Sequence, residues 1–570
     1  MPKPSAPPLD PDLVLPATLL SRYLFFLGRR PVSAANAHYR SSRIGALQSL
    51  AVLFDDAEIR EPLRALTPAN LFRVAPRLQN RLQPSLAYRL PRDLVATPHA
   101  PPPEFWRGVR RIAVIYGPAI GIGDEIVASS IPRVLQTLAP HASLDVLTAY
   151  AGLWERIAPD ARASQYASLA VLLERIRGGG DEAIVYIDFE PPGLLAAVAQ
   201  EPGVTRFAEL SVGTRSLTFL DASARRLHTM PAEQAARENF YDAVRAMSRW
   251  LLMTPQVSSL LMTPQLSSLL MTPQVSSLAM GPTSGDERAE GPGQSALPAL
   301  PALGADVPRN GRRRTIDRLH RVVVSPFTSK EDPSERVWRG ILTAALAPAP
   351  ELHIVLDTGP NAATRAFAIA IRDVLRAHGL RCDLAAGGRA ASLGEMLDLA
   401  RDADAVIAAD SYLAHAAPLF GALTLVVARE GLEPWRVPSP ESFYFRSELD
   451  PDAIGAAMSV LLREPRVSPR QSLEAAALRD AAAAVDLDAP LDALLDAWQR
   501  CFDAHNALLA TLPEWPAPFA TLMRDERYSR ILPRAPRRDG IGESELRAHL
   551  ARRFADCAES NLWKFVRGTV

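Results

Sequence analysis

Short apolar runs alternate with amphipathic segments in two long parts of the chain. In the first part, Arg111–Tyr116, Ser143–Thr148 and Glu182–Phe189 have the continuous apolar character of buried strands. The segment Asp124–Ala139 places its apolar residues on one helical face, and Ala235–Leu252 predicts a long closing helix. Strands that alternate with helices favour parallel βαβ units with right-handed crossovers.

The same alternation returns between residues 321 and 462. The expected strands are Arg321–Ser325, Leu352–Asp357, Cys382–Ala385, Asp404–Ala409 and Thr424–Ala428. The expected helices are Glu335–Leu346, Ala362–His378, Leu393–Arg401, His415–Phe420 and Asp450–Leu462. Two doubly wound, Rossmann-like halves that face each other define a ligand cleft.

Both ends of the chain show helical periodicity. Residues 1–106 show no strand pattern, and we interpret them as an α-helical accessory region. The expected helices are Ala17–Gly28, Ser42–Phe54 and Ala65–Leu82 there, and Gln471–Val485, Leu491–Leu512, Ala520–Ile531 and Ser544–Arg567 at the other end.

A low-complexity segment separates the two halves. Leu252–Leu260, Leu261–Leu269 and Leu270–Leu278 are tandem copies of one unit. A proline in every copy breaks helix continuity, and copies this short and few do not make a solenoid core. We interpret the repeat as a slippage duplication in a tolerant loop, with a docking segment as the alternative. Residues 281–308 are rich in Gly, Pro, Ala and Ser, which is typical of disordered or extended chain.

The predicted organisation has five regions, with α-helical regions at the ends and a repeat-containing, Pro/Gly/Arg-rich linker between the halves. The regions are 1–106, 107–252, 253–320 (the linker), 321–465 and 466–570.

Composition narrows the classes of protein. The chain is 48% hydrophobic and 22% charged with a formal net charge of zero, so attraction to nucleic acid or to a membrane is not implied. Cys382, Cys501 and Cys557 are the only cysteines, and their wide separation gives neither a disulfide framework nor metal-ligand spacing. No secretory signal or membrane-spanning run is evident, so we expect a cytoplasmic protein that at most touches a membrane peripherally.

The strongest chemical signal is Asp410-Ser411-Tyr412 followed by His415. These residues come directly after the predicted strand Asp404–Ala409 and open the next helix. Ligands of open α/β sheets bind at this edge, and a helix start suits phosphate groups. Helix capping by Asp410 and Ser411 is the alternative for an isolated pair of this kind.

A second signal lies in the other half, where Gly117–Asp124 follows a strand and opens a helix. Gly121 and Gly123 belong to its loop. A carboxylate repels phosphate, so Asp124 fits a general base that takes a proton from an acceptor hydroxyl. Capping of the helix is an equally supported local interpretation of Asp124.

Two motifs carry a family resemblance. Arg111–Pro140, with Gly123-Asp124, resembles the N-terminal signature of glycosyltransferase family 9, the lipopolysaccharide heptosyltransferase family. Residues 410–415 are similar to its Asp-Thr-Gly-x-x-His motif, and Arg336-Val337-Trp338 is similar to its Lys-x-Trp. The resemblance covers roughly residues 110–252 and 321–463.

The resemblance implies a GT-B fold and inverting, metal-independent transfer from a nucleotide-diphospho-sugar, with a heptose as one candidate sugar and no cofactor. The 107–252 half then binds the acceptor, with Asp124 as the base. The 321–465 half binds the donor. Its implied donor-binding residues are Asp410, Ser411, Tyr412, His415 and Thr328, with Lys330 or Arg336 as the cation that neutralises the departing diphosphate.

The chain departs from the family pattern at Tyr412, where the family has glycine, and this places close backbone approach to a phosphate in question. The acceptor need not be a lipopolysaccharide core; a glycan, a lipid-linked acceptor and a protein remain open. Trp435 and Arg436 lie where family members line the donor site, with a packed Trp and a surface Arg as the alternative. Two other functions stay open: a catalytically degenerate GT-B scaffold that binds a nucleotide sugar or a protein partner, and a nucleotide-sugar epimerase.

Overall fold

The computed structural model resolves the chain into two compact units. Unit 1 contains the described residues up to 252, and unit 2 contains those from 319 onward. The structure describes residues 11–28, 44–82, 94–117, 120–158, 161–166, 183–189, 195, 205–232, 239–252, 319–328, 333–429, 435–437, 439, 441–463, 469–487, 489–514, 520, 532–534, 542–558 and 560–568. The predicted linker except for its last two residues, Lys330 and the predicted helical segment 521–531 lie outside these ranges.

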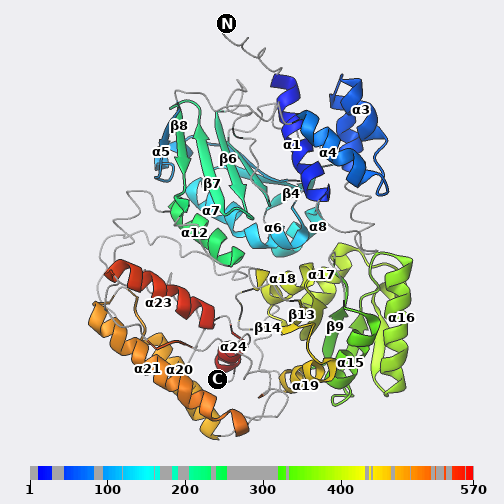
Figure 1. Cartoon of the computed structure of the whole chain (residues 1–570), viewed down its shortest axis with the longest axis vertical. Coiled ribbons are helices and arrows are strands. Elements are labelled where there is room, and N and C mark those ends of the chain that lie inside the picture. The colour runs from blue at the N-terminus through cyan, green and yellow to red at the C-terminus, as the bar shows by residue number, and fades with distance from the viewer. Residues whose placement is uncertain are drawn as a thin grey trace, which may run out of the picture. The chain divides into compact units, whose positions relative to one another are not determined.

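Unit 1 is built on a mixed sheet with the order β1-β8-β7-β6-β5-β2-β3-β4 (Figure 1). Its strands are β1 (Val95–Thr97), β2 (Arg111–Tyr116), β3 (Ser143–Thr148), β4 (Arg162–Gln165), β5 (Ala183–Asp188), β6 (Arg206–Ser211), β7 (Ser216–Asp221) and β8 (Arg226–Thr229). Five adjacent strands of this sheet are parallel, in the spatial order β4, β3, β2, β5 and β6. Strand β7 is antiparallel to both its neighbours. The parallel part runs 3-2-1-4-5 in chain order, which is the order of a doubly wound fold.

The helices of unit 1 belong to two groups. The N-terminal group is α1 (Pro11–Gly28), a helical turn at 44–50, η1 (Ala51–Leu53), α3 (Ala57–Arg64) and α4 (Leu71–Leu82). The second group is α5 (Pro103–Trp106), α6 (Ile122–Ala128), α7 (Ser130–Leu138), α8 (Ala151–Ile157) and α12 (Phe240–Leu252).

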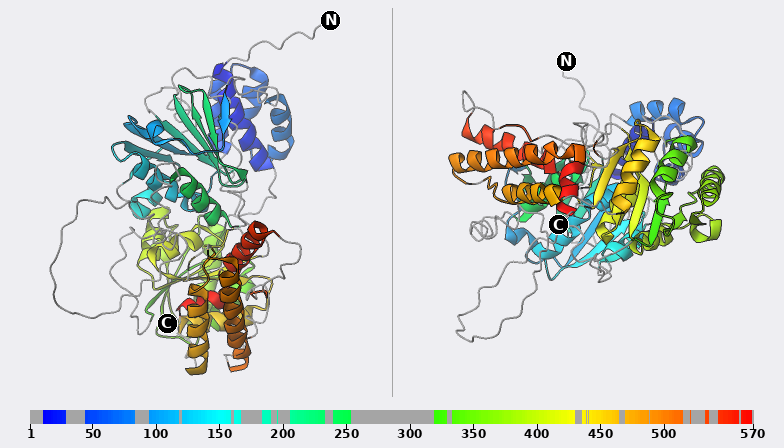
Figure 2. Two further views of the ribbon diagram at one scale, coloured as in Figure 1. Left: turned by 90° about the vertical axis from the view of Figure 1, so that its left-hand side faces the viewer. Right: turned by 90° about the horizontal axis from the view of Figure 1, so that it is seen from below.

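The N-terminal helices share a hydrophobic core with the sheet. Leu20, Leu47 and Leu63 are buried in one cluster with Ile115 and Phe207 of the central strands. Figures 1 and 2 show α1, α3 and α4 to one side of this sheet. These helices therefore form a structural layer of unit 1.

Unit 2 is built on an entirely parallel sheet with the order β11-β10-β9-β12-β13-β14. This is the 3-2-1-4-5-6 order of a Rossmann fold. Its strands are β9 (Arg321–Ser325), β10 (His353–Leu356), β11 (Arg381–Leu384), β12 (Ala405–Ala409), β13 (Leu423–Ala428) and β14 (Ser442–Arg446). The predicted fold class, two Rossmann-like halves in one chain, is confirmed.

The helices around this sheet are α15 (Glu335–Leu346), α16 (Ala362–Ala377), η3 (Ala385–Gly388), α17 (Leu393–Arg401), α18 (Tyr412–Ala416), η4 (Ala417–Phe420) and α19 (Pro451–Leu462). Helices α15 and α19 pack closely because α19 carries Gly455. A Cβ at this glycine would lie 2.3 Å from the carbonyl oxygen of Ile341 on α15.

The C-terminal helices belong to unit 2. They are α20 (Pro469–Ala483), α21 (Leu491–Ala510), η6 (Leu512–Glu514), α23 (Glu543–Ala558) and α24 (Asn561–Gly568). The side chain of Asn561 on α24 pairs with the edge strand β14: its Nδ2 donates to the carbonyl of Tyr444 at 2.9 Å, and its Oδ1 accepts from the Tyr444 N–H at 3.3 Å. Among the described residues, no helix is long and apolar enough to cross a membrane.

Several expectations require correction. Residues 1–106 contain the strand β1, which pairs with β8, so that region is not purely helical. The helix expected at Asp124–Ala139 is divided into α6 and α7 at Ser129. The helix expected at His415–Phe420 begins earlier, at Tyr412, and continues as η4.

Candidate functional site

The carboxyl edge of the unit 2 sheet has a switch point between β9 and β12. The chain leaves β9 toward β10 on one side and later enters β12 on the other. Residues that directly follow these two strands flank the crevice where such sheets bind ligands. The structure therefore brings Thr328, which follows β9, to the same edge as Asp410 and Ser411, which follow β12.

Ser411 presents a buried hydroxyl at this switch point. Its backbone is extended, with φ −138° and ψ 178°, and it precedes α18 without making a side-chain cap bond. The Ser411 Oγ is buried and has no hydrogen-bond partner among the described residues. A buried hydroxyl without a partner costs about 1–3 kcal/mol, and a ligand oxygen that bonds to it removes this cost.

Two other candidate donor-site residues flank Ser411 in the chain: Asp410 directly precedes it, and His415 follows four positions later. Asp410 follows β12 and is buried, and His415 is buried on α18. The short helix α18 packs on the sheet through Ala414, which shares a cluster with Val426 and Tyr444. Both donor-site candidates thus lie on the segment that leaves the carboxyl edge of β12.

Tyr412 lies beside a second acid, Asp357, which directly follows β10. The Asp357 carboxylate accepts hydrogen bonds from the Ser325 hydroxyl at 2.8 Å and from the Gly359 N–H at 2.9 Å. Burial raises the pKa of Asp357, and these hydrogen bonds oppose the rise. Burial and the Asp357 charge hold the pKa of Tyr412 well above its ordinary value, so the phenol is neutral.

Of the two candidate cations, the structure describes Arg336 alone. Arg336 is exposed on the first turn of α15, while its neighbour Trp338 is fully buried in the core. Lys330 is outside the described residues. Of the two residues that match Lys-x-Trp, Trp338 is therefore a core residue and Arg336 faces solvent.

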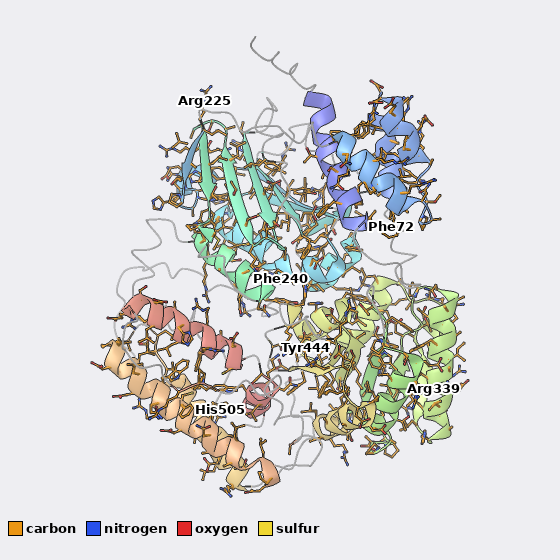
Figure 3. All side chains as sticks on the ribbon, viewed as in Figure 1. Phe72, Arg225, Phe240, Arg339, Tyr444 and His505 are labelled. Atoms are coloured by element: carbon orange, nitrogen blue, oxygen red, sulfur yellow. The ribbon has the colours of Figure 1, made fainter. Side chains whose placement is uncertain are left out.

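A further pair of cations gathers around Tyr444 of β14 (Figure 3). The guanidinium carbon of Arg436 lies 5.5 Å from the centre of its ring, and the Lys564 Nζ lies 5.3 Å from it. Lys564 is buried and also donates to the carbonyl of Val437 at 3.4 Å. Trp435 is half-buried beside Arg436. Sequence reasoning missed Lys564 because α24 is remote from this loop in the chain.

In unit 1, the switch point lies between β2 and β5. Gly117 follows β2, and a Cβ there would displace the Asp188 carboxylate and the Tyr186 hydroxyl. Asp124 lies in the first turn of α6 and is half-buried. Its Oδ2 accepts a hydrogen bond at 2.8 Å from the N–H of Gly121, the N-cap residue, so Asp124 caps α6 from the third helical position. Gly123 lies on the same turn, between the cap and Asp124.

Two buried acids near this edge were not singled out from the sequence. Glu125 is fully buried, and its oxygens accept from the Thr148 hydroxyl at 2.5 Å and from the Trp154 Nε1 at 2.9 Å. Asp188 at the end of β5 accepts from the Tyr186 hydroxyl at 2.8 Å and from the Phe189 N–H at 2.7 Å. Position was a signal for Asp188, which ends an apolar run, whereas Glu125 follows Gly123 and Asp124 at the start of a helix and carried no such signal. In the described ranges, no cluster of three His, Cys, Asp or Glu side chains could hold a metal ion.

Comparison with known proteins gives structural similarity only. No family model and no curated protein matches the sequence. Similar solved structures include Escherichia coli ADP-heptose lipopolysaccharide heptosyltransferase II, with 17% identity and a TM-score of 0.38 over 62% of this chain and 99% of that one. E. coli heptosyltransferase WaaC with ADP has 13% identity and a TM-score of 0.37 over 60% and 97%. A glycosyl transferase family 9 protein from Veillonella parvula has 12% identity and a TM-score of 0.35 over 59% and 86%.

These neighbours are heptosyltransferases and a family 9 glycosyltransferase, the family that the two sequence motifs resemble. Similarity of this size assigns neither donor nor acceptor to this chain.

Proposed function

We propose that this protein is an inverting glycosyltransferase that moves a sugar from a nucleotide-diphospho-sugar to an acceptor hydroxyl without a metal ion. The observation that carries the proposal is the convergence of Thr328, Asp410 and Ser411 at the switch point of unit 2. Ser411 contributes a buried hydroxyl that has no partner among the described residues. A heptose is the donor sugar that the family resemblance favours.

In the proposed reaction, Asp124 takes the proton of the acceptor hydroxyl as that oxygen attacks the anomeric carbon of the donor. The bond from this carbon to the diphosphate breaks in the same displacement, so the configuration inverts. The leaving diphosphate gains negative charge, which hydroxyl donors and a cation stabilise in place of a metal. Ser411 and Thr328 are the proposed hydroxyl donors, His415 and Asp410 complete the donor site, and Lys330 or Arg336 supplies the cation.

The hydrogen bond from Gly121 to Asp124 is compatible with this role. A carboxylate has two oxygens and several lone pairs, so one oxygen can cap α6 while the carboxylate also accepts a proton. The proposal requires that the Asp124 carboxylate and the Ser411 hydroxyl act on the same bound donor and acceptor.

The test is a nucleotide-sugar array read by mass spectrometry, with the full chain and its Asp124→Asn variant. Asparagine keeps an oxygen that can accept from the Gly121 N–H but cannot act as the base. Transfer should fall by about 10²–10⁴-fold, the usual contribution of a general base. Unchanged turnover would remove Asp124 from the chemistry.

Asp56→Asn is the matched control. Asp56 is another acid that caps a helix of unit 1: it is the N-cap of α3, and its side chain accepts from the Glu58 N–H at 2.8 Å. Its replacement should leave turnover unchanged, because it lies on a helix remote in sequence from both motifs.

A catalytically degenerate binding scaffold is the second candidate, and Tyr412 beside Asp357 favours it. A tyrosine at the family's glycine position limits backbone approach to a phosphate. Thermal-shift measurements with nucleoside diphosphates separate the cases in part, because a ligand at a hundred times its Kd stabilises by about 2.7 kcal/mol. Stabilisation without turnover of any donor in the array would favour the scaffold.

A further inference from the structure

The first turn of α6 carries two consecutive acids with different surroundings. Asp124 is half-buried, whereas Glu125 is 0% exposed. Successive helical residues point about 100° apart, so the two carboxylates leave the helix in different directions. Glu125 points into the protein and contacts residues of two other elements.

Both partners of Glu125 must donate to it. The Trp154 indole N–H is only a donor, and it lies 2.9 Å from the Glu125 Oε2. The Thr148 hydroxyl accepts from the Tyr150 N–H at 2.9 Å and therefore directs its own hydrogen to the Glu125 Oε1, 2.5 Å away. Two accepting oxygens are what an ionised carboxylate provides, and hydrogen bonds to a charged group are about twice as strong as neutral ones.

These bonds tie three elements together at the carboxyl edge of the sheet. Thr148 is the last residue of β3, Trp154 lies on α8, and Glu125 lies on α6. The Tyr116 ring, at the end of β2, lies 5.3 Å from the Trp154 ring, and the Tyr116 hydroxyl donates to the carbonyl of Ala128 at the end of α6. The orientation of α6 is thus fixed at both its ends.

From this network we infer that Glu125 is a positioning residue for Asp124, an inference that rests on the proposed function. The buried Glu125 carboxylate holds the first turn of α6 against β3 and α8. That turn presents the Asp124 oxygen to the Gly121 N–H and sets the direction from which Asp124 reaches an acceptor hydroxyl. Reaction rates are sensitive to such placement, because a misplacement of about 1 Å can cost about 10²-fold.

The central experiment is a double-mutant cycle on kcat. Glutamine has one accepting oxygen where Glu125 uses two, and it carries no charge, so Glu125→Gln removes one of the two accepted bonds. We expect kcat to fall about 10- to 100-fold with the donor KM unchanged. In the Asp124→Asn background, the same change should alter kcat less than about threefold, because residues that act through one another are not additive.

Thr148→Val is the second variant, since it keeps the side-chain shape and removes a single bond to Glu125. It should lower kcat in the same direction and by a smaller factor. Glu155→Gln is the matched control: Glu155 is exposed on α8 next to Trp154, and its replacement should leave kcat unchanged. A loss of kcat that repeats in full in the Asp124→Asn background would overturn the inference.

Amide hydrogen exchange gives a readout that does not need activity. Exchange in the peptide 120–128 should accelerate at least tenfold in Glu125→Gln and stay unchanged in Glu155→Gln. Unchanged exchange in Glu125→Gln would overturn the inference even if the wild-type protein is an active transferase. Absence of transfer by the wild-type protein with every donor, together with accelerated exchange in the variant, would instead overturn the proposed function and retain Glu125 as the residue that holds this turn.

Discussion

In unit 1, the buried acids at the carboxyl edge of the sheet each accept hydrogen bonds from at least two donors, whereas in unit 2 the buried Ser411 hydroxyl has no partner among the described residues. The two sheets share the order 3-2-1-4-5 in their parallel parts. Equal topology therefore does not produce equal polar chemistry. Unit 2 also holds a buried acid with two donors, Asp357, so the difference between the two edges lies in the buried Ser411 hydroxyl, which keeps polar capacity for a ligand.

Unit 2 contains another incompletely bonded polar group in His505 of α21 (Figure 3). This residue is 0% exposed, its Nδ1 accepts from the Leu532 N–H at 3.1 Å, and its Nε2 has no partner among the described residues. Burial lowers the pKa of His505 to about 4. The neutral ring is therefore the form that the folded unit accommodates.

The largest expected effect is the acid sensitivity that this histidine gives to unit 2. An unfolded histidine binds a proton near pH 6.5, while folded His505 binds one only near pH 4, so protonation favours the unfolded state between these values. The His505 contribution should be complete above pH 6.5 and fall by about 3 kcal/mol as the pH drops to 4, since one pKa unit corresponds to about 1.4 kcal/mol.

Urea unfolding of the wild type and of His505→Leu at several pH values measures this contribution. The stability difference between the two should change by about 3 kcal/mol from pH 7 to pH 4, because the leucine does not titrate. A difference that is independent of pH would contradict the assigned pKa shift of His505.

The next prediction concerns Asp188, at the carboxyl edge of the unit 1 sheet. Asp188→Ala leaves the Tyr186 hydroxyl and the Phe189 N–H without their acceptor. The loss of its acceptor costs about 1–3 kcal/mol for the buried Tyr186 hydroxyl and about 1 kcal/mol for the half-buried Phe189 N–H, so we expect a loss of about 2–4 kcal/mol in the free energy of unfolding. Urea unfolding checks this value, and the exposed Glu104→Ala in the same unit serves as its control. A loss below about 0.5 kcal/mol would show that this edge is not stabilised by its acid.

The smallest effect on stability is expected at the open edge of unit 2. Ser411→Ala removes a buried hydroxyl that makes no hydrogen bond with the described residues, so the free energy of unfolding should not fall and should rise by about 1–3 kcal/mol. Binding of a nucleoside diphosphate should nevertheless weaken about tenfold, the value of one hydrogen bond of about 1.4 kcal/mol. Calorimetric titration of wild type and variant measures it; a large loss of stability with unchanged affinity would reverse the contrast between the edges.

Much of the parallel core could be predicted from sequence. The strands Arg321–Ser325 and Arg111–Tyr116 were predicted to the residue, because strands buried on both faces are short continuous apolar runs with clear ends. The strands β6 to β8 were missed. They form antiparallel hairpins, and polar residues interrupt their apolar runs, so no continuous apolar stretch marks them in the sequence.

The candidate site could be predicted only in part. The positions of Asp124 and Ser411 at carboxyl edges follow from the order of strands and helices along the chain. The partners of Glu125 do not, because Thr148 and Trp154 approach it from separate elements, and packing between elements decides which side chains meet. The same holds for Lys564, whose contact with Val437 joins residues 127 positions apart in the chain.

The amide of Asn561 has a consequence for how copies of this protein behave in solution. The outermost strand of a sheet offers free backbone groups to any passing chain, and native proteins cover such strands to avoid aggregation. By bonding both the N–H and the carbonyl of Tyr444, one side chain imitates a neighbouring strand for a single residue. Removing α24 would expose the backbone groups of Tyr444 and allow β14 to pair with a strand of another copy of the protein.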